Sequence, residues 1–355
     1  MKALAQASKA ALLVFLLFLS SHPPLAQAAI ITIDTVAVGD AGNADDSSTS
    51  YGGVDYSFNM GCFEVSNGQY TEFLNAVAAT DTHGLYQSGM HYNYRSQASN
   101  TGIVRSGSSG SYTYSTSTPD SPVHTVSYWS AVRFANWMSN GQGSGSTETG
   151  AYDLTDSDAI TNNTLARASW YDSSSGNTSG STVWALPTID EFYKAGWYQS
   201  SGSGGDSDDY WKWATGTNTS PTAASSITDT SENKVVYFQN GSWGDRLYGP
   251  ADAEESSGLS YYGTCGQEGN MSEWIDTIGS DSGKRTITGL NFASDFDGLG
   301  LARFSESTPT TKTYTMGFRL VSLTAVPEPH EYALMAGLGL LGWAAFRSRL
   351  RKNPA

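Results

Sequence analysis

Two cysteines are the residues of this chain with the richest chemistry, and they lie far apart in the sequence. Cys62 and Cys265 are the only cysteines among 355 residues. A thiolate can bind a soft metal such as Cu(I) or attack as a nucleophile, whereas two neighbouring thiols can form a disulfide. The choice depends on the compartment, because disulfides persist outside the cytoplasm. Both alternatives stay open at this point.

The other groups that could bind a metal lack the required spacing. His83, His91 and His124 show no zinc-like pattern, and we expect them to be loop or core residues. The acidic run GGDSDD at 204–209 resembles a calcium loop only in composition, since it lacks the spacing and the closing glutamate of an EF-hand. The sequence contains neither a phosphate-binding glycine loop that opens a helix nor a nucleophile elbow.

The N-terminal end carries an export signal. Lys2 and Lys9 precede an apolar run at 10–19, and the small residues of AQA at 26–28 follow a proline-containing bend. This order is typical of a secretory signal peptide, here residues 1–28, cleaved after Ala28. We therefore expect an exported protein in which Cys62 and Cys265 form a disulfide.

The C-terminal end has a similar three-part order. Pro327, Glu328 and Pro329 precede fourteen apolar residues at 333–346 and a basic cluster at 347–352. The apolar run would span about 21 Å as a helix, short for a hydrocarbon core of about 30 Å unless flanking side chains extend it. The segment 326–352 resembles the PEP-CTERM sorting signal of Gram-negative bacteria. That resemblance implies that the segment first anchors the protein in the membrane, with the basic cluster in the cytoplasm. An exosortase would then remove the tail. The alternative is a permanent transmembrane tail anchor.

Composition between the two signals restricts the partners. Residues 29–326 keep 13 basic and 32 acidic residues, a net charge near −19. This charge disfavours nucleic acid and anionic lipid as partners, and it is compatible with divalent cations or a hydrated polysaccharide matrix. Long stretches of Ser, Thr, Gly and Asn, interrupted by many Trp and Tyr, predict a loop-rich fold with aromatic core patches.

Three helices are predicted from capping residues followed by apolar residues at helical spacing. A Ser or Thr side chain can accept a hydrogen bond from the free N–H groups of the first turn. In the first helix, Ser66 and Gln69 form the cap, and the buried face is Tyr70, Phe73, Leu74 and Val77. In the second, Ser127 is the cap, and the buried face is Trp129, Val132, Ala135 and Met138. In the third, Thr188 and Glu191 form the cap, and the buried face is Phe192, Ala195 and Tyr198. Short strands are expected at 56–65 and 314–321.

Five sequence blocks follow one another along the chain. They read FEVSNGQY at 63–70, PVHTVSYWSA at 122–131, ALPTIDEFYKA at 185–195, GNMSEW at 269–274 and MGFRL at 316–320. In this order they resemble the sulfatase-modifying-factor or formylglycine-generating-enzyme family. The resemblance implies a single α+β domain over residues 29–322, with an irregular, loop-rich fold related to C-type lectins.

The resemblance also implies a copper chemistry from which this chain departs. In the family's enzyme, two nearby cysteines bind Cu(I), and oxygen then oxidises a substrate cysteine to formylglycine. The matching segment, GLNFASDFDGL at 289–299, places Ser294 and Leu299 at the two cysteine positions. Oxygen and carbon groups do not replace soft thiolates as Cu(I) ligands. Since Cys62 and Cys265 match no catalytic position of the family, we predict no catalytic residue and no copper.

Structural calcium is a further implication of the resemblance. One family site uses the GNMSEW block, where Gly269 and Met271 would supply backbone oxygens and Glu273 a carboxylate, the hard ligands that Ca²⁺ takes. The family's side-chain ligand three residues earlier is replaced here by Gly266, which offers none. Without a metal, Glu273 would be a partly exposed acid beside Trp274.

Two functions are compatible with these observations. The first is a non-catalytic, exported module that binds an extracellular polysaccharide or a surface protein through aromatic rings and fixed polar groups. The second is a copper-dependent oxidation of a peptidyl cysteine, or another reaction in the same cleft. The missing sulfur at Ser294 and Leu299 favours the first.

Overall fold

The three predicted helices all form, and each begins at its predicted cap. The computed structural model describes residues 30–224, 231–238, 249–255, 258–288, 290–294 and 304–323. Ser66 caps α2 (Asn67–Val77) and Thr188 caps α5 (Ile189–Trp197), each within a complete capping box, while Ser127 caps α3 (Tyr128–Ser139). The local hydrogen-bonding capacity of the cap therefore fixes where these helices start.

The buried faces of these helices follow the predicted spacing, with two exceptions. Val77 and Trp129 are only half-buried, whereas the other predicted core positions of the three helices are buried. A fourth helix, α4 (Ser157–Thr161), was not predicted and has no buried residue. It lacks the apolar stripe by which a helix is predicted, and Asp156 caps it instead.

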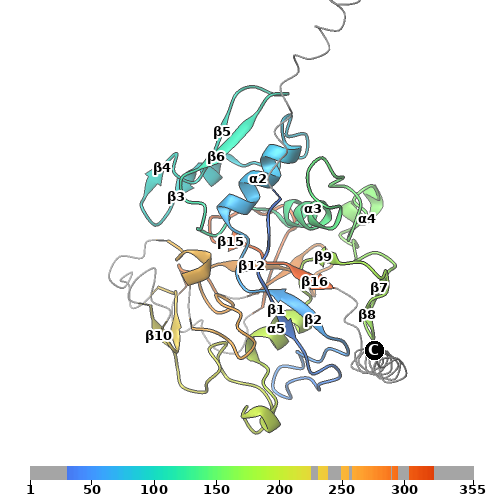
Figure 1. The fold of residues 1–355 in the computed structure, drawn as a ribbon, viewed down its shortest axis with the longest axis vertical. Coiled ribbons are helices and arrows are strands. Elements are labelled where there is room, and N and C mark those ends of the chain that lie inside the picture. The colour runs from blue at the N-terminus through green and yellow to red at the C-terminus, as the bar shows by residue number, and fades with distance from the viewer. Residues whose placement is uncertain are drawn as a thin grey trace, which may run out of the picture.

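Two four-stranded sheets form the centre of the fold (Figure 1). The first is antiparallel with the order β1-β2-β16-β9, and the second has the order β14-β13-β12-β15 and is parallel only between β12 and β15. Their strands are β1 (Thr35–Val38), β2 (Phe58–Gly61), β9 (Val183–Ala185), β12 (Ser272–Ile278), β13 (Arg285–Thr288), β14 (Ser305–Ser307), β15 (Met316–Gly317) and β16 (Val321–Leu323).

Short ribbons and single helical turns make up the remaining regular structure. The antiparallel ribbons pair β3 (Tyr92–Asn93) with β4 (Ala98–Ser99), β5 (Ile103–Ser106) with β6 (Thr113–Thr116), and β7 (Tyr171–Asp172) with β8 (Gly176–Asn177). A parallel ribbon pairs β10 (Thr222–Ala223) with β11 (Lys234–Val235). The 3-10 turns within the described residues are η1 (Ser88–His91), η2 (Ser201–Ser203) and η4 (Ala253–Glu255). This loop-rich α+β architecture confirms the predicted fold class.

The strand predictions are correct in place and too long in extent. The segment 56–65 forms only β2, and 314–321 is divided between β15 and the start of β16. The longest strand, β12, was not predicted. Its first four residues are all buried, so the alternation that indicates a half-exposed strand is missing there.

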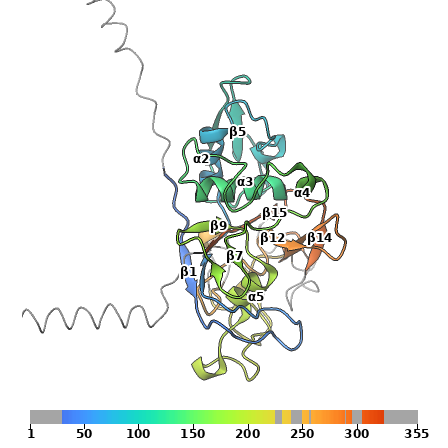
Figure 2. The ribbon, with the colours of Figure 1, turned by 90° about the vertical axis from the view of Figure 1, so that its right-hand side faces the viewer.

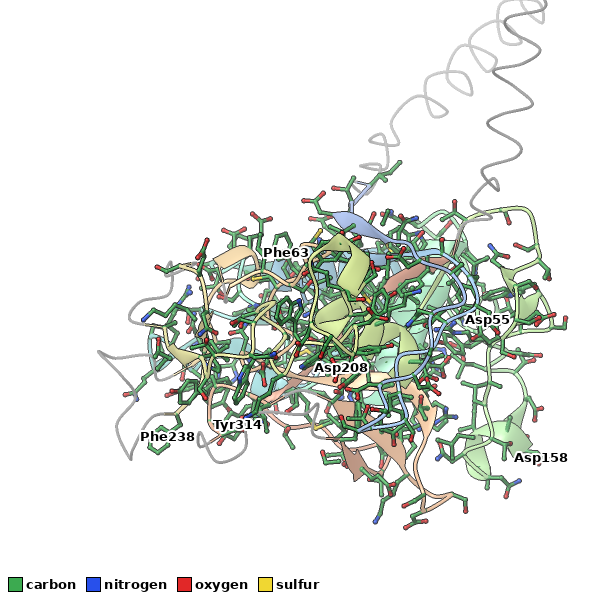
Figure 3. All side chains as sticks on the ribbon, turned by 90° about the horizontal axis from the view of Figure 1, so that it is seen from below. Asp55, Phe63, Asp158, Asp208, Phe238 and Tyr314 are labelled. Atoms are coloured by element: carbon green, nitrogen blue, oxygen red, sulfur yellow. The ribbon has the colours of Figure 1, made fainter. Side chains whose placement is uncertain are left out.

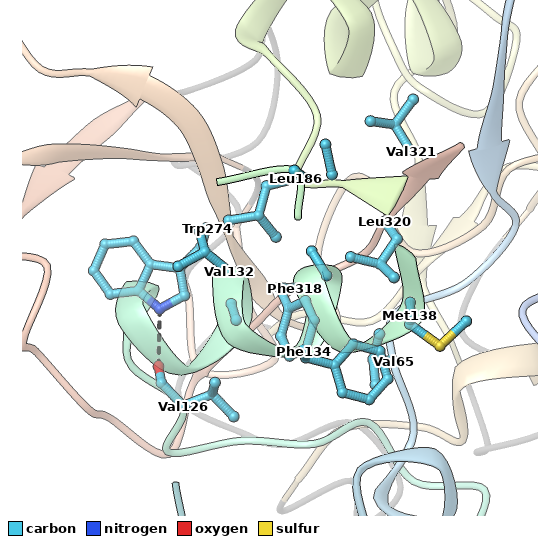
Figure 4. Close-up of a cluster of buried hydrophobic side chains, with 14 of the residues drawn as sticks. Val65, Val126, Val132, Phe134, Met138, Leu186, Trp274, Phe318, Leu320 and Val321 are labelled. Carbon is cyan, nitrogen blue, oxygen red and sulfur yellow. Dashed lines mark hydrogen bonds between the residues drawn. The ribbon is translucent and has the colours of Figure 1, made fainter. Parts of the chain in front are cut away.

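All five sequence blocks contribute to one core between the helices and the sheets. Figures 1 and 2 show α2 and α3 on one side of the sheets and α5 on the other. In the close-up of Figure 4, one buried side chain comes from each block: Val65, Val126, Leu186, Trp274 and Phe318. The indole Nε1 of Trp274 donates a hydrogen bond of 2.8 Å to the carbonyl oxygen of Val126. The blocks are thus the contact points of the fold.

The two predicted sorting segments lie outside the described residues. These are residues 1–28 and 326–352, including Pro327, Glu328 and Pro329. Within the part of the chain that the structure describes, every helix is too short or too polar to cross a membrane.

Candidate functional site

Arg319, from the last sequence block, is the centre of a buried cluster of polar groups. Its guanidinium is fully buried and donates hydrogen bonds of 2.7 to 3.1 Å to both carboxylate oxygens of Glu273. It also donates to the backbone carbonyl oxygens of Cys62 at 3.1 Å and Cys265 at 2.8 Å. Although burial opposes the charge, the Glu273 carboxylate raises the pKa of Arg319, so the guanidinium stays protonated.

A second carboxyl group, that of Glu64, completes this cluster. Asn270 donates a hydrogen bond of 3.0 Å to Glu64 Oε1, while Glu64 Oε2 is buried with no hydrogen-bond partner. Burial raises the pKa of Glu64 to about 8; the nearby Glu273 also raises it, and Arg319 lowers it. One guanidinium thus faces two carboxyl groups, of which Glu64 is protonated at neutral pH. We call Glu64, Asn270, Glu273 and Arg319 the Arg319 cluster.

Asn270 connects this cluster to three other segments of the chain, through the buried residues Val236, Ala251 and Phe292. Its backbone N–H donates to the carbonyl of Val236, and its own carbonyl accepts from the N–H of Phe292, both at 2.9 Å. Its side-chain oxygen accepts from the N–H of Ala251 at 2.9 Å. The preceding Gly269 has a φ of +93°, and a Cβ there would stand 2.4 Å from the carbonyl oxygen of Val236. The Gly-Asn pair is explained by this close approach of the chains.

The three predicted calcium ligands do not fit a calcium ion in this arrangement. Glu273 is fully buried, contrary to the expectation of a partly exposed acid, and both of its oxygens accept hydrogen bonds from Arg319. A Ca²⁺ ion on this carboxylate would face the guanidinium cation at contact distance, which is electrostatically unfavourable. Gly269 and Met271 lie close to Glu273 in the sequence and could supply only neutral backbone oxygens. The negative charge of Glu273, which the ion would need, is already neutralised by Arg319.

The two cysteines are neighbours in the fold, as a disulfide requires, and both are free thiols in the structure. The N–H of Cys265 donates to the carbonyl of Cys62 at 2.8 Å. Cys62 is half-buried, whereas Cys265 is 1% exposed. Burial and then the nearby Asp34 raise the pKa of Cys62, so its reactive thiolate form is disfavoured. This environment does not resemble that of an activated thiol, and the cross-link stays a prediction.

The segment that matches the family's cysteine pair forms a turn held by its own polar groups. The N–H of Ser294 donates to the carbonyl of Asn291 at 2.9 Å, and the carbonyl of Ser294 accepts from Phe238 at 2.9 Å. Asn291 Nδ2 donates to Ser272 Oγ at 3.0 Å. Leu299, the second matching position, lies outside the described residues. At Ser294 the chain thus offers a hydroxyl group where the resemblance places a sulfur ligand.

Three tyrosines form an aromatic surface beside this turn, which we call the tyrosine platform: Tyr92, Tyr94 and Tyr314. The rings of Tyr94 and Tyr314 are stacked with centroids 4.5 Å apart, and Tyr92 packs edge-on against Tyr94 at 4.7 Å. Phe292 of the turn lies 6.0 Å from Tyr314, centroid to centroid. Tyr314 is 42% exposed, and Figure 3 shows its position at the same side of the molecule as Phe238.

Of the three histidines considered, His91 and His124 belong to this region. His91 packs edge-on against Tyr92, with ring centroids 6.5 Å apart. His124 lies against the next ring of the platform. Its ring packs edge-on against Tyr94 at 5.3 Å, and burial lowers its pKa to about 4. His83 instead lies 3.5 Å from Glu148. Within the described residues, no three His, Cys, Asp or Glu side chains lie close enough together to hold a metal ion. The acidic run at 204–209 bonds within its own loops, with Asp206 accepting from Asn218 and Asp209 from Ser201.

A second buried network was missed by the sequence analysis. Arg167 donates to Glu191 at 2.6 Å and to Asp276 at 3.0 Å, with Glu191 fully buried at the start of α5. The hydroxyls of Tyr128 and Tyr152 both donate to Asp276. The capping role of Glu191 could be predicted, but its ion pair joins residues far apart in the sequence. This network stabilises the joint between α5 and β12.

Comparison with protein families identifies the domain. Residues 35–323 match the sulfatase-modifying factor enzyme 1-like domain. The chain belongs to this family. The inference from the five sequence blocks is therefore confirmed, and so is a single α+β domain.

Three solved structures are similar to this chain. The crystal structure of CarF superposes with a TM-score of 0.50 and 20% sequence identity, covering 83% of this chain and 99% of CarF. Treponema denticola variable protein 1 gives a TM-score of 0.48 at 15% sequence identity, covering 83% of this chain and 96% of its own. PvdO from Pseudomonas aeruginosa gives a TM-score of 0.43 at 12% sequence identity, covering 82% of this chain and 91% of its own. At 20% identity, the likeness to CarF shows the fold alone. The comparison with curated proteins gives no match.

Proposed function

We propose that this chain is an exported, non-catalytic member of the family that binds an extracellular polysaccharide. The observation that carries the proposal is the surrounding of Ser294. A hydroxyl occupies the position of a family cysteine, and the neighbouring Phe292 contacts the exposed ring of Tyr314. Aromatic rings next to fixed polar groups are a usual combination in sites for small polar ligands.

The tyrosine platform suits a sugar ring for two physical reasons. One face of Tyr314 is stacked on Tyr94, which holds the ring in place and lowers the entropy lost on binding. The strongly negative chain disfavours polyanions as ligands, so a neutral polysaccharide is the better partner.

The test is binding of the purified protein to a panel of neutral and acidic polysaccharides. We expect neutral members to bind, and the Tyr314→Ala variant to bind about tenfold more weakly, since a stacked ring contributes on the order of 1–2 kcal/mol. Tyr314→Phe keeps the ring face and should keep most of the affinity. Absence of binding across the whole panel would remove the polysaccharide proposal.

The alternative function, copper-dependent oxidation of a peptidyl cysteine, draws on one observation. Cys62 and Cys265 are adjacent, as a two-coordinate Cu(I) site would need. Against this, Cys265 is buried and the pKa of Cys62 is raised, whereas a copper ligand is a thiolate that an incoming ion can reach.

The proposed location outside the cytoplasm has its own test. The resemblance of 326–352 to a PEP-CTERM signal supports release by an exosortase after export. Mass spectrometry of the protein recovered from the cell surface should find a mature N-terminus after Ala28 and no residues of the basic tail. Recovery of the chain with the tail intact would instead support a permanent anchor.

A further inference from the structure

A large open groove lies apart from the tyrosine platform and shares no lining residue with it. It has a volume of about 800 Å³, which lies in the range of ligand sites. Its walls come from four parts of the described chain: Gln199 just after α5, and the segments 215–219, 232–233 and 258–261.

The polar groups of the groove are neutral with one exception. The described residues that line it include threonines, a serine and two amides, one carboxylate at Glu232, and no Lys, Arg or His. The amides are fixed in place: Asn233 accepts from Thr215 at 2.8 Å, and Gln199 accepts from Trp211 at 2.9 Å. A groove with this lining suits a neutral ligand rich in hydroxyl groups and repels polyanions.

Several polar groups of the groove remain available to a ligand. Among the described residues, the side chains of Thr219, Glu232 and Tyr261 have no hydrogen-bond partner. Each can exchange water for a ligand hydroxyl at little cost, because hydroxyls both donate and accept.

Two exposed apolar side chains stand on the same segment of the groove. Leu259 is 58% exposed and Tyr261 is 45% exposed, and both line the groove. Tyr261 packs edge-on against Tyr262 at 5.2 Å, and the hydroxyl of Tyr262 donates to Asp40 at 3.1 Å. The ring of Tyr261 is therefore supported from one side. The apolar faces of a sugar ring would cover these two side chains, while its hydroxyls meet the threonines.

We propose that this groove is a second binding site, for a segment of a neutral oligosaccharide. This inference goes beyond the proposed function, because it assigns a different surface and holds even if the tyrosine platform binds nothing. With both sites in use, one polymer chain could engage the protein twice, and binding would then tighten with polymer length.

The test measures the affinity of the purified protein for soluble neutral glucan and mannan oligosaccharides, with a uronic acid polymer as the charged comparison. We expect Tyr261→Ala to weaken binding of the neutral ligands about tenfold and Tyr261→Phe to keep most of it. Glu232→Gln should strengthen binding of the uronic acid polymer relative to the neutral ligands, because it removes the only charge among the described residues that line the groove.

The same titration separates this inference from the proposed function. If Tyr261→Ala leaves every dissociation constant unchanged while Tyr314→Ala abolishes binding, the groove is not a site and the platform stands. If Tyr314→Ala is silent and Tyr261→Ala weakens binding, the groove alone is the site. If no neutral oligosaccharide binds the folded wild-type protein, the groove proposal is overturned. A thermal melt checks folding of each variant, and the exposed position of Tyr261 makes a folding defect unexpected.

Discussion

The Arg319 cluster and the tyrosine platform are joined through Asn270 and Phe292, yet they are built on opposite principles. The cluster is made of residues from the sequence blocks and is fully buried. Nearly all of its own polar side-chain atoms form hydrogen bonds to other protein groups. The platform is made of tyrosines outside the blocks, and its outer ring, Tyr314, is exposed. The comparison teaches that the blocks which carry the family resemblance build the buried scaffold, while the exposed rings lie outside those blocks.

The comparison is tested most strongly by removing the guanidinium of the cluster. We expect Arg319→Met to lower the free energy of unfolding by about 3–5 kcal/mol, because Glu273 would be left buried and unpaired. Chemical denaturation followed by circular dichroism measures this change. Arg95→Met is the matched control: Arg95 pairs with Asp252 at a partly exposed position, and we expect a loss of no more than about 1 kcal/mol. Equal effects of the two variants would contradict the structural role of the cluster.

The next effect concerns the cysteine pair beneath Arg319. We expect the protein, when produced in an oxidising compartment and purified without reductant, to have no titratable thiol, and reduction to lower its free energy of unfolding by about 2–4 kcal/mol. The double variant Cys62→Ser, Cys265→Ser should behave like the reduced protein with or without reductant. Two thiols that react in denaturant without prior reduction would show that the pair stays open.

Glu64 gives a pH dependence of defined sign. The folded protein holds the Glu64 proton up to about pH 8, whereas the ordinary carboxyl value is 4.5. Between these values the folded state binds more protons than the unfolded chain, so the contribution of Glu64 to stability falls as the pH rises. Glu64→Gln keeps the acceptor for Asn270 and removes this dependence. Its stability relative to the wild type should therefore increase from about pH 5 to about pH 9, by on the order of a few kcal/mol.

Urea denaturation at several pH values checks this result. Glu254→Gln, on an exposed position, serves as the control and should leave the pH dependence unchanged. A Glu64→Gln variant that loses stability relative to the wild type as the pH rises would mean that Glu64 is ionised in the folded state.

The smallest effects are expected at the surface. Tyr314→Ala and Tyr261→Ala should each change the free energy of unfolding by no more than about 0.5–1 kcal/mol, because both side chains are exposed and lie outside the Arg319 cluster. A larger loss at either position would mean that the ring stabilises the fold and is not held available for a ligand.

The sequence predicted those parts of the fold that depend on local interactions. Ser66, Ser127 and Thr188 cap helices because their hydroxyls reach N–H groups only a few residues away. By contrast, the partial exposure expected for Glu273 was wrong. Its partner, Arg319, lies in a different sequence block, and nothing near Glu273 in the sequence indicates that a guanidinium will bury it.

The candidate binding surfaces could not be predicted from the sequence either, because they too depend on contacts between distant segments. Tyr94 and Tyr314 are separated by most of the domain, and their stacking follows from the way the loops return over the sheets. Likewise, Tyr261 and Thr219 come from different loops and meet only in the folded groove. A chain with many scattered tyrosines does not reveal which rings meet, because no fixed spacing links residues of different loops.

The most direct measurement for the central claim is a titration of the fully reduced, purified protein with Cu(I) against a competing chelator, without oxygen. The account predicts no stoichiometric binding, and the same result for the Cys62→Ser, Cys265→Ser variant. The family's sulfur position is occupied by Ser294, Cys265 is buried, and burial raises the pKa of the half-buried Cys62. One tightly bound Cu(I) per chain that is lost in the double variant, followed by oxygen uptake with a cysteine-containing peptide once oxygen is admitted, would contradict it.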